Sequence, residues 1–147
     1  MKQRTTFGVA ACAALLASCA SMTGGDKPRL GSMLGDTTGQ KGRACIKVND
    51  IKGYGVLEDN VISIEGKGEH YLATVQPGCS EISQSAQILF SGDFGEVCGE
   101  ALDEIVAGEE RCTINQLFEF NNREAAMKAY HASLERRDQF TNDQPTG

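Results

Sequence analysis

Seven carboxylates crowd one short stretch of the sequence and could do chemistry together. They are Asp93, Glu96, Glu100, Asp103, Glu104, Glu109 and Glu110. Two carboxylates about 5 to 9.5 Å apart can hydrolyse a glycosidic bond, and clustered oxygens can hold Ca²⁺. The stretch lacks the D-x-[DN]-x-[DN]-G spacing of a calcium loop, and runs of acids usually form a hydrated face. A carboxylate-dependent hydrolase is therefore the second alternative for the function.

The spacing of the histidines and serines matches no metal-binding or nucleophile motif. His70 and His131 do not form an H-E-x-x-H metal motif, and each is expected at the surface or partly packed. Ser80, Ser83 and Ser85 lie in no G-x-S-x-G elbow. The sequence thus predicts no catalytic residue, no metal ligand and no cofactor, and it favours a protein that is not an enzyme.

Cysteine is the residue type with the clearest structural pattern. Cys45, Cys79, Cys98 and Cys112 remain in the body of the chain, and an even count in a small exported domain is typical of a disulfide framework. Their spacings contain no C-x-x-C pair, which argues against a zinc or thioredoxin-type site. Four cysteines allow three pairings. We expect Cys45–Cys112 with Cys79–Cys98, because the first and last strands of a closing barrel are often neighbours; free, reactive thiols are the alternative.

The first 18 residues have the pattern of a removable export leader. Lys2 and Arg4 precede ten apolar residues at 7–16, and Ala17-Ser18-Cys19 follows. An apolar run of this length is typical of a secretory signal and is too short to span a bilayer. We therefore predict a lipoprotein signal peptide over residues 1–18.

The segment Leu16-Ala17-Ser18-Cys19 resembles a bacterial lipobox. That resemblance implies a diacylated Cys19 thiol, cleavage before this cysteine and acylation of the new amino terminus. A competing pattern at 9–12 would leave too short an apolar run, so Cys12 is expected to leave with the leader. Because no Asp follows Cys19, the resemblance favours the outer membrane, with the body facing the periplasm; display at the cell surface stays open.

Charge narrows the classes of partner. Removing residues 1–18 leaves 129 residues with 12 basic and 20 acidic side chains, a net charge of −8. Such a chain has no surplus of Lys and Arg to release counterions from a nucleic-acid backbone, so nucleic acid is excluded as a partner. No apolar run reaches the roughly 18 residues of a membrane span. The expected partners are the membrane, through the N-terminal lipid, and an envelope protein.

Composition changes near residue 44. Residues 20–43 contain six glycines and no periodic pattern, so we predict that 19–43 comprise the lipidated cysteine and a flexible tether. Over 44–120, short β-rich segments alternate with turn residues every 8 to 12 positions. This pattern predicts a mainly β domain, a small antiparallel barrel or sandwich of short strands stapled by disulfides.

The last part of the chain has helical periodicity. Asn121 and Glu124 match a capping box, and Met127, Tyr130 and Leu134 recur on one face. We predict one C-terminal α-helix over 121–138 whose apolar stripe packs on the β-rich domain. Residues 139–147 are polar and are expected to form a disordered tail.

The body from Cys45 to about Phe118 resembles a family of small bacterial exported lipoproteins with paired cysteines, classed only as a domain of unknown function. The resemblance is carried by Cys45-Ile46 with Ile51 and Tyr54, the Val-Leu-Glu-Asp turn at 56–59, Tyr71 before Cys79, Cys98 with Asp103, and Cys112-Thr113-Ile114. It implies an exported, β-rich body with paired cysteines and transfers no activity.

The sequence leaves three functional hypotheses. The leading one is a non-enzymatic, lipid-anchored periplasmic module that acts in envelope structure or as an accessory to another protein. The alternative is a small barrel that binds a peptide, a glycan or a cation. The carboxylate-dependent hydrolase is third.

Overall fold

The structure is a computed structural model that describes residues 29–143. The predicted leader over 1–18, the lipidation site at Cys19 and residues 144–147 of the predicted tail lie outside the described residues.

The described chain is mainly β, with an α-helix near each end. In chain order the elements are α1 (Leu30–Thr38), β1 (Cys45–Lys47), the 3₁₀ turn η1 (Val48–Asp50), β2 (Gly53–Glu58), β3 (Val61–Glu65), β4 (His70–Val75), α2 (Glu81–Gln84), β5 (Ile88–Ser91), the 3₁₀ turn η2 (Asp93–Gly95), β6 (Glu96–Cys98), β7 (Glu104–Ala107), β8 (Glu110–Phe120) and α3 (Arg123–Asn142).

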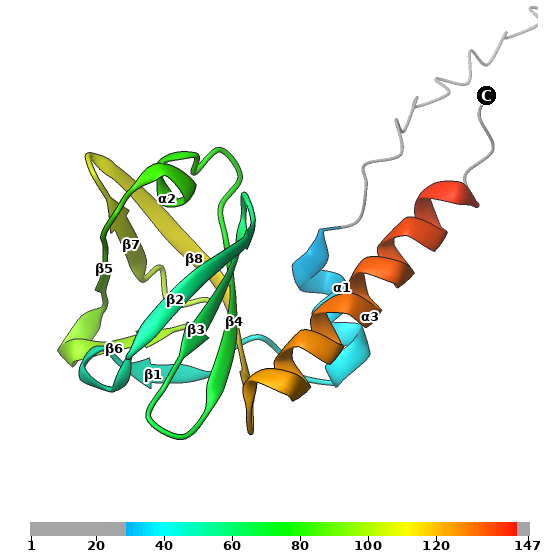
Figure 1. The fold of residues 1–147 in the computed structure, drawn as a ribbon, viewed down its shortest axis with the longest axis horizontal. Coiled ribbons are helices and arrows are strands. Elements are labelled where there is room, and N and C mark those ends of the chain that lie inside the picture. The colour runs from blue at the N-terminus through cyan, green and yellow to red at the C-terminus, as the bar shows by residue number, and fades with distance from the viewer. Residues whose placement is uncertain (1–28, 144–147) are drawn as a thin grey trace, which may run out of the picture.

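The strands form two antiparallel sheets. The larger has six strands in the order β2-β3-β4-β8-β7-β5 and curls into a half-barrel, and β1 pairs with β6 across one end of it (Figure 1). This arrangement confirms the predicted mainly β class and the small antiparallel barrel-like architecture. β6 was not expected, because Glu96-Val97-Cys98 buries one apolar side chain and shows no alternating run.

The inner side of the curled sheet holds the larger core. Ile62, Ile64, Ile105 and Leu117 are fully buried there, and one β-branched or leucine side chain after another fills the space between the sheet walls. At the open seam of the half-barrel, Tyr54 of β2 meets Phe90 of β5 edge-to-face, with ring centroids 6.4 Å apart. An aromatic contact thus joins the two edge strands that no described hydrogen-bonded ladder connects.

The outer side of the sheet is covered by a layer of two helices. α1 and α3 lie together on this side (Figure 1), where Leu34, Val61, Leu72 and Phe118 form a second buried cluster. β3 and β4 are therefore buried on both faces, since Val61 faces the helices and Ile62 faces the inner core. Double burial explains why these strands read as nearly continuous apolar runs.

The predicted flexible tether over 19–43 is wrong from residue 30 onward, because α1 occupies Leu30–Thr38 and packs on the body. Its glycines have poor helix propensity, so residue type alone did not predict a helix here. Leu30, Met33 and Leu34 nevertheless follow the i, i+3, i+4 spacing of a helix and are buried. Gly31 lies so close to the Gln116 side chain that a Cβ would collide with it. Tertiary packing, not intrinsic helix preference, therefore stabilises α1.

α3 begins later and ends later than predicted. Asn122, not Asn121, is the N-cap, and its Oδ1 accepts a hydrogen bond from the Ala125 N–H at 2.8 Å. The helix continues through Asn142, so the expected disorder at 139–142 is also wrong. Tyr130 of the predicted stripe is buried against the sheet, and Arg137 forms a two-pronged ion pair with Glu58 at the end of β2.

None of the described helices has both the length and the apolarity that a bilayer crossing requires.

The four cysteines form two disulfides, as predicted, but the predicted pairing of Cys45–Cys112 and Cys79–Cys98 is wrong. The cross-links are Cys45–Cys98 and Cys79–Cys112. Cys45 lies directly opposite Cys98 in the β1–β6 pair. The predicted Cys45–Cys112 bond assumed that the first and last strands are neighbours. Instead β8, which carries Cys112, lies in the middle of the sheet between β4 and β7. There Cys112 faces Cys79 from the segment after β4, with the two Cα atoms 5.9 Å apart.

The pairing predicts a specific peptide map. Digestion of the oxidised protein without reduction should link the Cys45 peptide to the Cys98 peptide and the Cys79 peptide to the Cys112 peptide. Replacing Cys45 and Cys98 together by serine should lower the unfolding free energy by roughly 2–4 kcal/mol, because the bond closes a loop of 53 residues. A Cys45–Cys112 linked peptide, or maleimide labelling of the unreduced body under denaturing conditions, would contradict this structure.

Because α1 packs on the body, we predict that replacing a buried residue of this helix lowers the free energy of unfolding. Leu34→Ala should lower the unfolding free energy by about 2–5 kcal/mol in a denaturant titration, since Leu34 is fully buried. Asp36→Ala, at an exposed position of the same helix, should change it by less than about 0.5 kcal/mol. Equal, small effects of the two substitutions would mean that α1 does not pack on the sheet.

Candidate functional site

A polar groove runs along the outer face of the sheet where the helical layer leaves it uncovered. One hollow, of about 340 Å³, lies over β2 and β3, and a second, of about 290 Å³, lies over the β3–β4 turn. Glu65, His70 and Arg123 line both hollows. The groove is thus framed by edge strand β2 on one side and by the first turn of α3 on the other.

Two glycines form the floor of the groove on β2. Tyr54 and Val56 pack toward the inner core, so their neighbours Gly53 and Gly55 belong to the outer face, opposite Glu65 and Ser63 of β3. A Cβ at either glycine would have no heavy atom within 4 Å. Glycine in a strand often marks close approach of a ligand or of another backbone. Here it leaves the main chain of β2 accessible from the groove.

A buried hydrogen bond between Ser63 and His70 forms the wall of the groove. The Ser63 Oγ and the His70 Nε2 are 2.7 Å apart, and the two residues are only 7% and 5% exposed. Burial lowers the pKa of His70 from its ordinary value of 6.5, the Arg123 charge lowers it further, and Glu65 opposes the shift. His70 is therefore neutral at pH 7. The expectation of a surface or partly packed His70 is wrong on burial, while His131 is exposed as expected.

The Ser63–His70 pair has one half of the geometry of an activated nucleophile. A serine needs a base within hydrogen-bond reach, and the base needs a third group that orients it. Glu65 lies opposite His70 across β3 and β4 and acts on it through its charge, but among residues 29–143 no carboxylate forms a hydrogen bond to this imidazole. The arrangement fixes the groove wall and supports binding of a ligand more directly than attack on one.

Four of the seven carboxylates that crowd this stretch of the sequence have separate partners in the fold. Glu100 pairs with Arg43, and Glu104 pairs with Arg111 at 2.9 Å. Asp103 accepts a hydrogen bond from the Cys98 N–H at 2.6 Å, and Glu110 accepts one from the Glu81 N–H at 2.8 Å. These contacts tie loops and strands together. Asp93, Glu96 and Glu109 are exposed.

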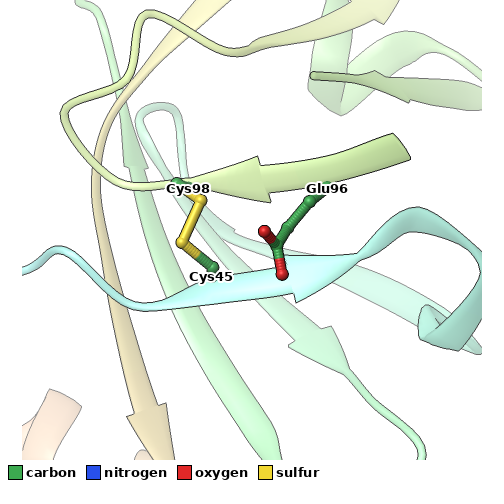
Figure 2. A group of neighbouring side chains, drawn as sticks. All are labelled: Cys45, Glu96 and Cys98. Atoms are coloured by element: carbon green, nitrogen blue, oxygen red, sulfur yellow. A yellow bond between two sulfur atoms is a disulfide. The ribbon is translucent and has the colours of Figure 1, made fainter. Parts of the chain in front are cut away.

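Each disulfide has a glutamate beside it. In the first group, the carboxylate of Glu96 and the sulfur atoms of Cys45 and Cys98 lie within 4.8 Å of one another, and Figure 2 shows Glu96 reaching toward β1 beside the bond. Glu110 holds the same position beside Cys79–Cys112. Thiolate, not disulfide sulfur, is the metal ligand, so neither group provides two thiolates while the cross-links are intact.

Sequence reasoning missed the residues that build the groove. Ser63 interrupts an otherwise apolar strand, and Gly53-Tyr54-Gly55 places two glycines on one face of a strand. Both are signals that a pattern analysis could have used. No local pattern predicts that His70 and Arg123 lie close together in the groove, because their proximity depends on strand register and on where α3 begins.

A sequence model of the Family of unknown function (DUF6491) matches residues 1–137 of the chain. No curated protein and no solved structure matches it. The family match fits the resemblance to an uncharacterised family.

The buried His70 predicts a pH-dependent stability. Since its pKa in the folded protein is below 6.5, the unfolded chain binds more protons just under pH 6.5. The unfolding free energy should therefore fall as the pH drops below 6.5, by at most about 1.4 kcal/mol per pH unit, until the lowered pKa is passed. Urea titrations of His70→Gln should lose this slope, and those of His131→Gln should keep it. A slope retained in His70→Gln would assign the effect to another group.

Proposed function

The chain belongs to the Family of unknown function (DUF6491), and from this premise we propose that it is a non-enzymatic, lipid-anchored module of the bacterial envelope that binds a short peptide segment in the groove. The observation that carries the proposal is the accessible main chain of Gly53 and Gly55 beside the buried, neutral Ser63–His70 pair.

The chemistry of the groove favours a polar ligand of little net charge. Lys52, Lys67 and Arg123 supply cationic donors, while Glu65 and Glu69 supply carboxylate acceptors. A ligand with both an amino and a carboxyl group could satisfy both kinds of partner. Small-molecule sites usually have this form, with a few convergent polar groups in a concave surface of about 300 Å³ or more.

The orientation of the aromatic residues favours a peptide over a glycan as the ligand of the groove. Sugar rings bind on exposed aromatic faces, but Tyr54 packs into the inner core and against Phe90. The outer face over Gly53 and Gly55 instead offers strand backbone, which an extended peptide can approach closely. This supports a peptide over the glycan and the cation that the sequence left open.

Support for export and anchoring comes from two independent features. Residues 16–19 match the lipobox pattern, and two disulfides are typical of proteins that fold in an oxidising compartment. Because α1 begins at Leu30, the spacer between Cys19 and the body shortens to residues 20–29. Ten extended residues reach at most about 35 Å, so the body would stay near the outer membrane, on its periplasmic side.

The anchor has a direct test. The mature protein from its native membrane should begin at Cys19, carry acyl chains there and partition into the detergent phase of a cloud-point extraction. Cys19→Ser should leave the leader uncut and abolish acylation, and Cys12→Ser should change neither. An unmodified Cys19 would refute the anchoring part of the proposal.

The groove predicts peptide-dependent thermal stabilisation. A panel of di- and tripeptides with free termini should raise the Tm of the purified body in a concentration-dependent way, because ligands that bind only the folded state stabilise it. Gly55→Leu, which fills the floor, should remove the shift, and Ser91→Leu on the opposite edge strand should retain it. Matched N-acetylglucosamine oligomers and CaCl₂ should give no shift.

Two outcomes would contradict the proposal in different ways. A shift with the sugar oligomers alone would overturn the ligand class while keeping a binding function. Labelling of Ser63 by a fluorophosphonate probe, lost in His70→Gln, would overturn the non-enzymatic reading and identify a serine hydrolase, the function that the 2.7 Å Ser63–His70 contact would otherwise favour.

A further inference from the structure

A third polar hollow lies at the first turn of α1 and shares no lining residue with the groove. Its volume is about 320 Å³, and α1, β4 and β8 each contribute to its lining. We propose that this hollow, here named the α1 hollow, binds a phosphate group. The proposal does not depend on the groove.

The first turn of α1 begins without a side-chain cap. Arg29 occupies the N-cap position, and its side chain makes no capping hydrogen bond. Its carbonyl accepts hydrogen bonds from the Ser32 and Met33 N–H groups, whereas within residues 29–143 nothing accepts the N–H groups of Leu30 and Gly31, which are both buried. Such N–H groups and the positive end of the helix dipole favour an anion. Because Gly31 lines the α1 hollow, this turn presents a main-chain donor there.

A buried hydroxyl without a partner lies beside the same turn. Thr74 of β4 is 5% exposed and lines the α1 hollow, and its Oγ1 would lie 3.3 Å from a Cβ on Gly31. Among the described residues this hydroxyl makes no hydrogen bond, and the one unpartnered side-chain atom sealed from solvent is Arg137 Nε. The Thr74 Oγ1 therefore opens onto the hollow. Because a buried polar group without a partner costs free energy, a ligand oxygen that accepts its hydrogen bond removes that cost.

Further hydrogen-bonding side chains surround the α1 hollow. Gln116, directly opposite Thr74 in the β4–β8 pair, also lies against Gly31, yet its amide makes no hydrogen bond within residues 29–143. One more hydroxyl and two more amides come from Ser32, Asn60 and Asn115. A phosphate suits such a lining because its oxygens accept several hydrogen bonds at once.

The charges beside the α1 hollow favour an anion. Arg29 is exposed and has no ion pair within the described residues, so its guanidinium is available to a ligand. Glu100 is the one carboxylate among the lining residues, and it is paired with Arg43. The net charge of −6 on the whole chain acts mainly over distances that salt screens, since the Debye length is about 8 Å at physiological ionic strength. A guanidinium beside a helix start is a typical phosphate-binding combination.

The proposal is tested by isothermal titration calorimetry of the mature, oxidised chain in a detergent that lacks phosphate. The probes are inorganic phosphate and glycerophosphoethanolamine, with acetate and glycerol for comparison. At least one phosphate probe should bind, and acetate and glycerol should not. Thr74→Val and Arg29→Gln should each weaken binding about tenfold, because each removes a hydrogen bond to a charged group. Thr113→Val and Lys41→Gln, the matched changes outside the hollow, should leave the affinity unchanged.

The outcomes separate the source of the phosphate from the existence of the site. Tighter binding of the ester points to a lipid headgroup, tighter binding of inorganic phosphate points to the free ion, and either result supports the proposal. Without ligand, Thr74→Val should keep or raise the Tm because it removes an unpartnered hydroxyl; if it lowers the Tm, the exposed Arg29→Gln decides alone. Equal binding of acetate or glycerol, binding that Arg29→Gln leaves unchanged, or no binding of either phosphate probe would overturn the proposal.

Discussion

The structure depends on closing a curled sheet whose edges do not pair with each other. The six strands end at β2 and β5, and across residues 29–143 no ladder joins those two edges. Side chains and cross-links close the half-barrel instead. Tyr54 meets Phe90 across the seam, Cys45–Cys98 holds the small β1–β6 pair at one end, and Cys79–Cys112 fastens the segment after β4 to the middle of the sheet. A body of this size buries limited apolar surface, so such cross-links have a large effect on whether it stays folded.

The same construction leaves one part of the outer face of the sheet open. Because α1 and α3 cover the outer face over Val61, Leu72 and Phe118, the part of that face beside the first turn of α3 stays open as the groove. The Asn122 cap and the Glu58–Arg137 ion pair fix where that turn lies, so they position Arg123 without lining the groove floor themselves.

The sequence was informative where the signal was local. Alternating β-rich segments predicted the fold class, a cap and an apolar stripe predicted the C-terminal helix, and the even cysteine count predicted two disulfides. It failed where the answer depends on strand order or packing. The partner of Cys112 follows from β8 lying mid-sheet, and α1 exists because Leu30, Met33 and Leu34 find a surface to cover, despite poor helix propensity. The Ser63–His70 contact likewise depends on the register of β3 against β4, which no single residue pattern specifies.

The docking of α1 on α3 also decides how the molecule responds to force. A pull on the chain ahead of Leu30 reaches α1 first, and it must detach Leu30, Met33 and Leu34 from their contacts before tension passes to Gly42, whose carbonyl accepts a hydrogen bond from the Leu117 N–H. The next point along the chain is Cys45, which is covalently joined to β6. We therefore expect α1 to detach first under load, while the Cys45–Cys98 disulfide keeps β1 joined to β6.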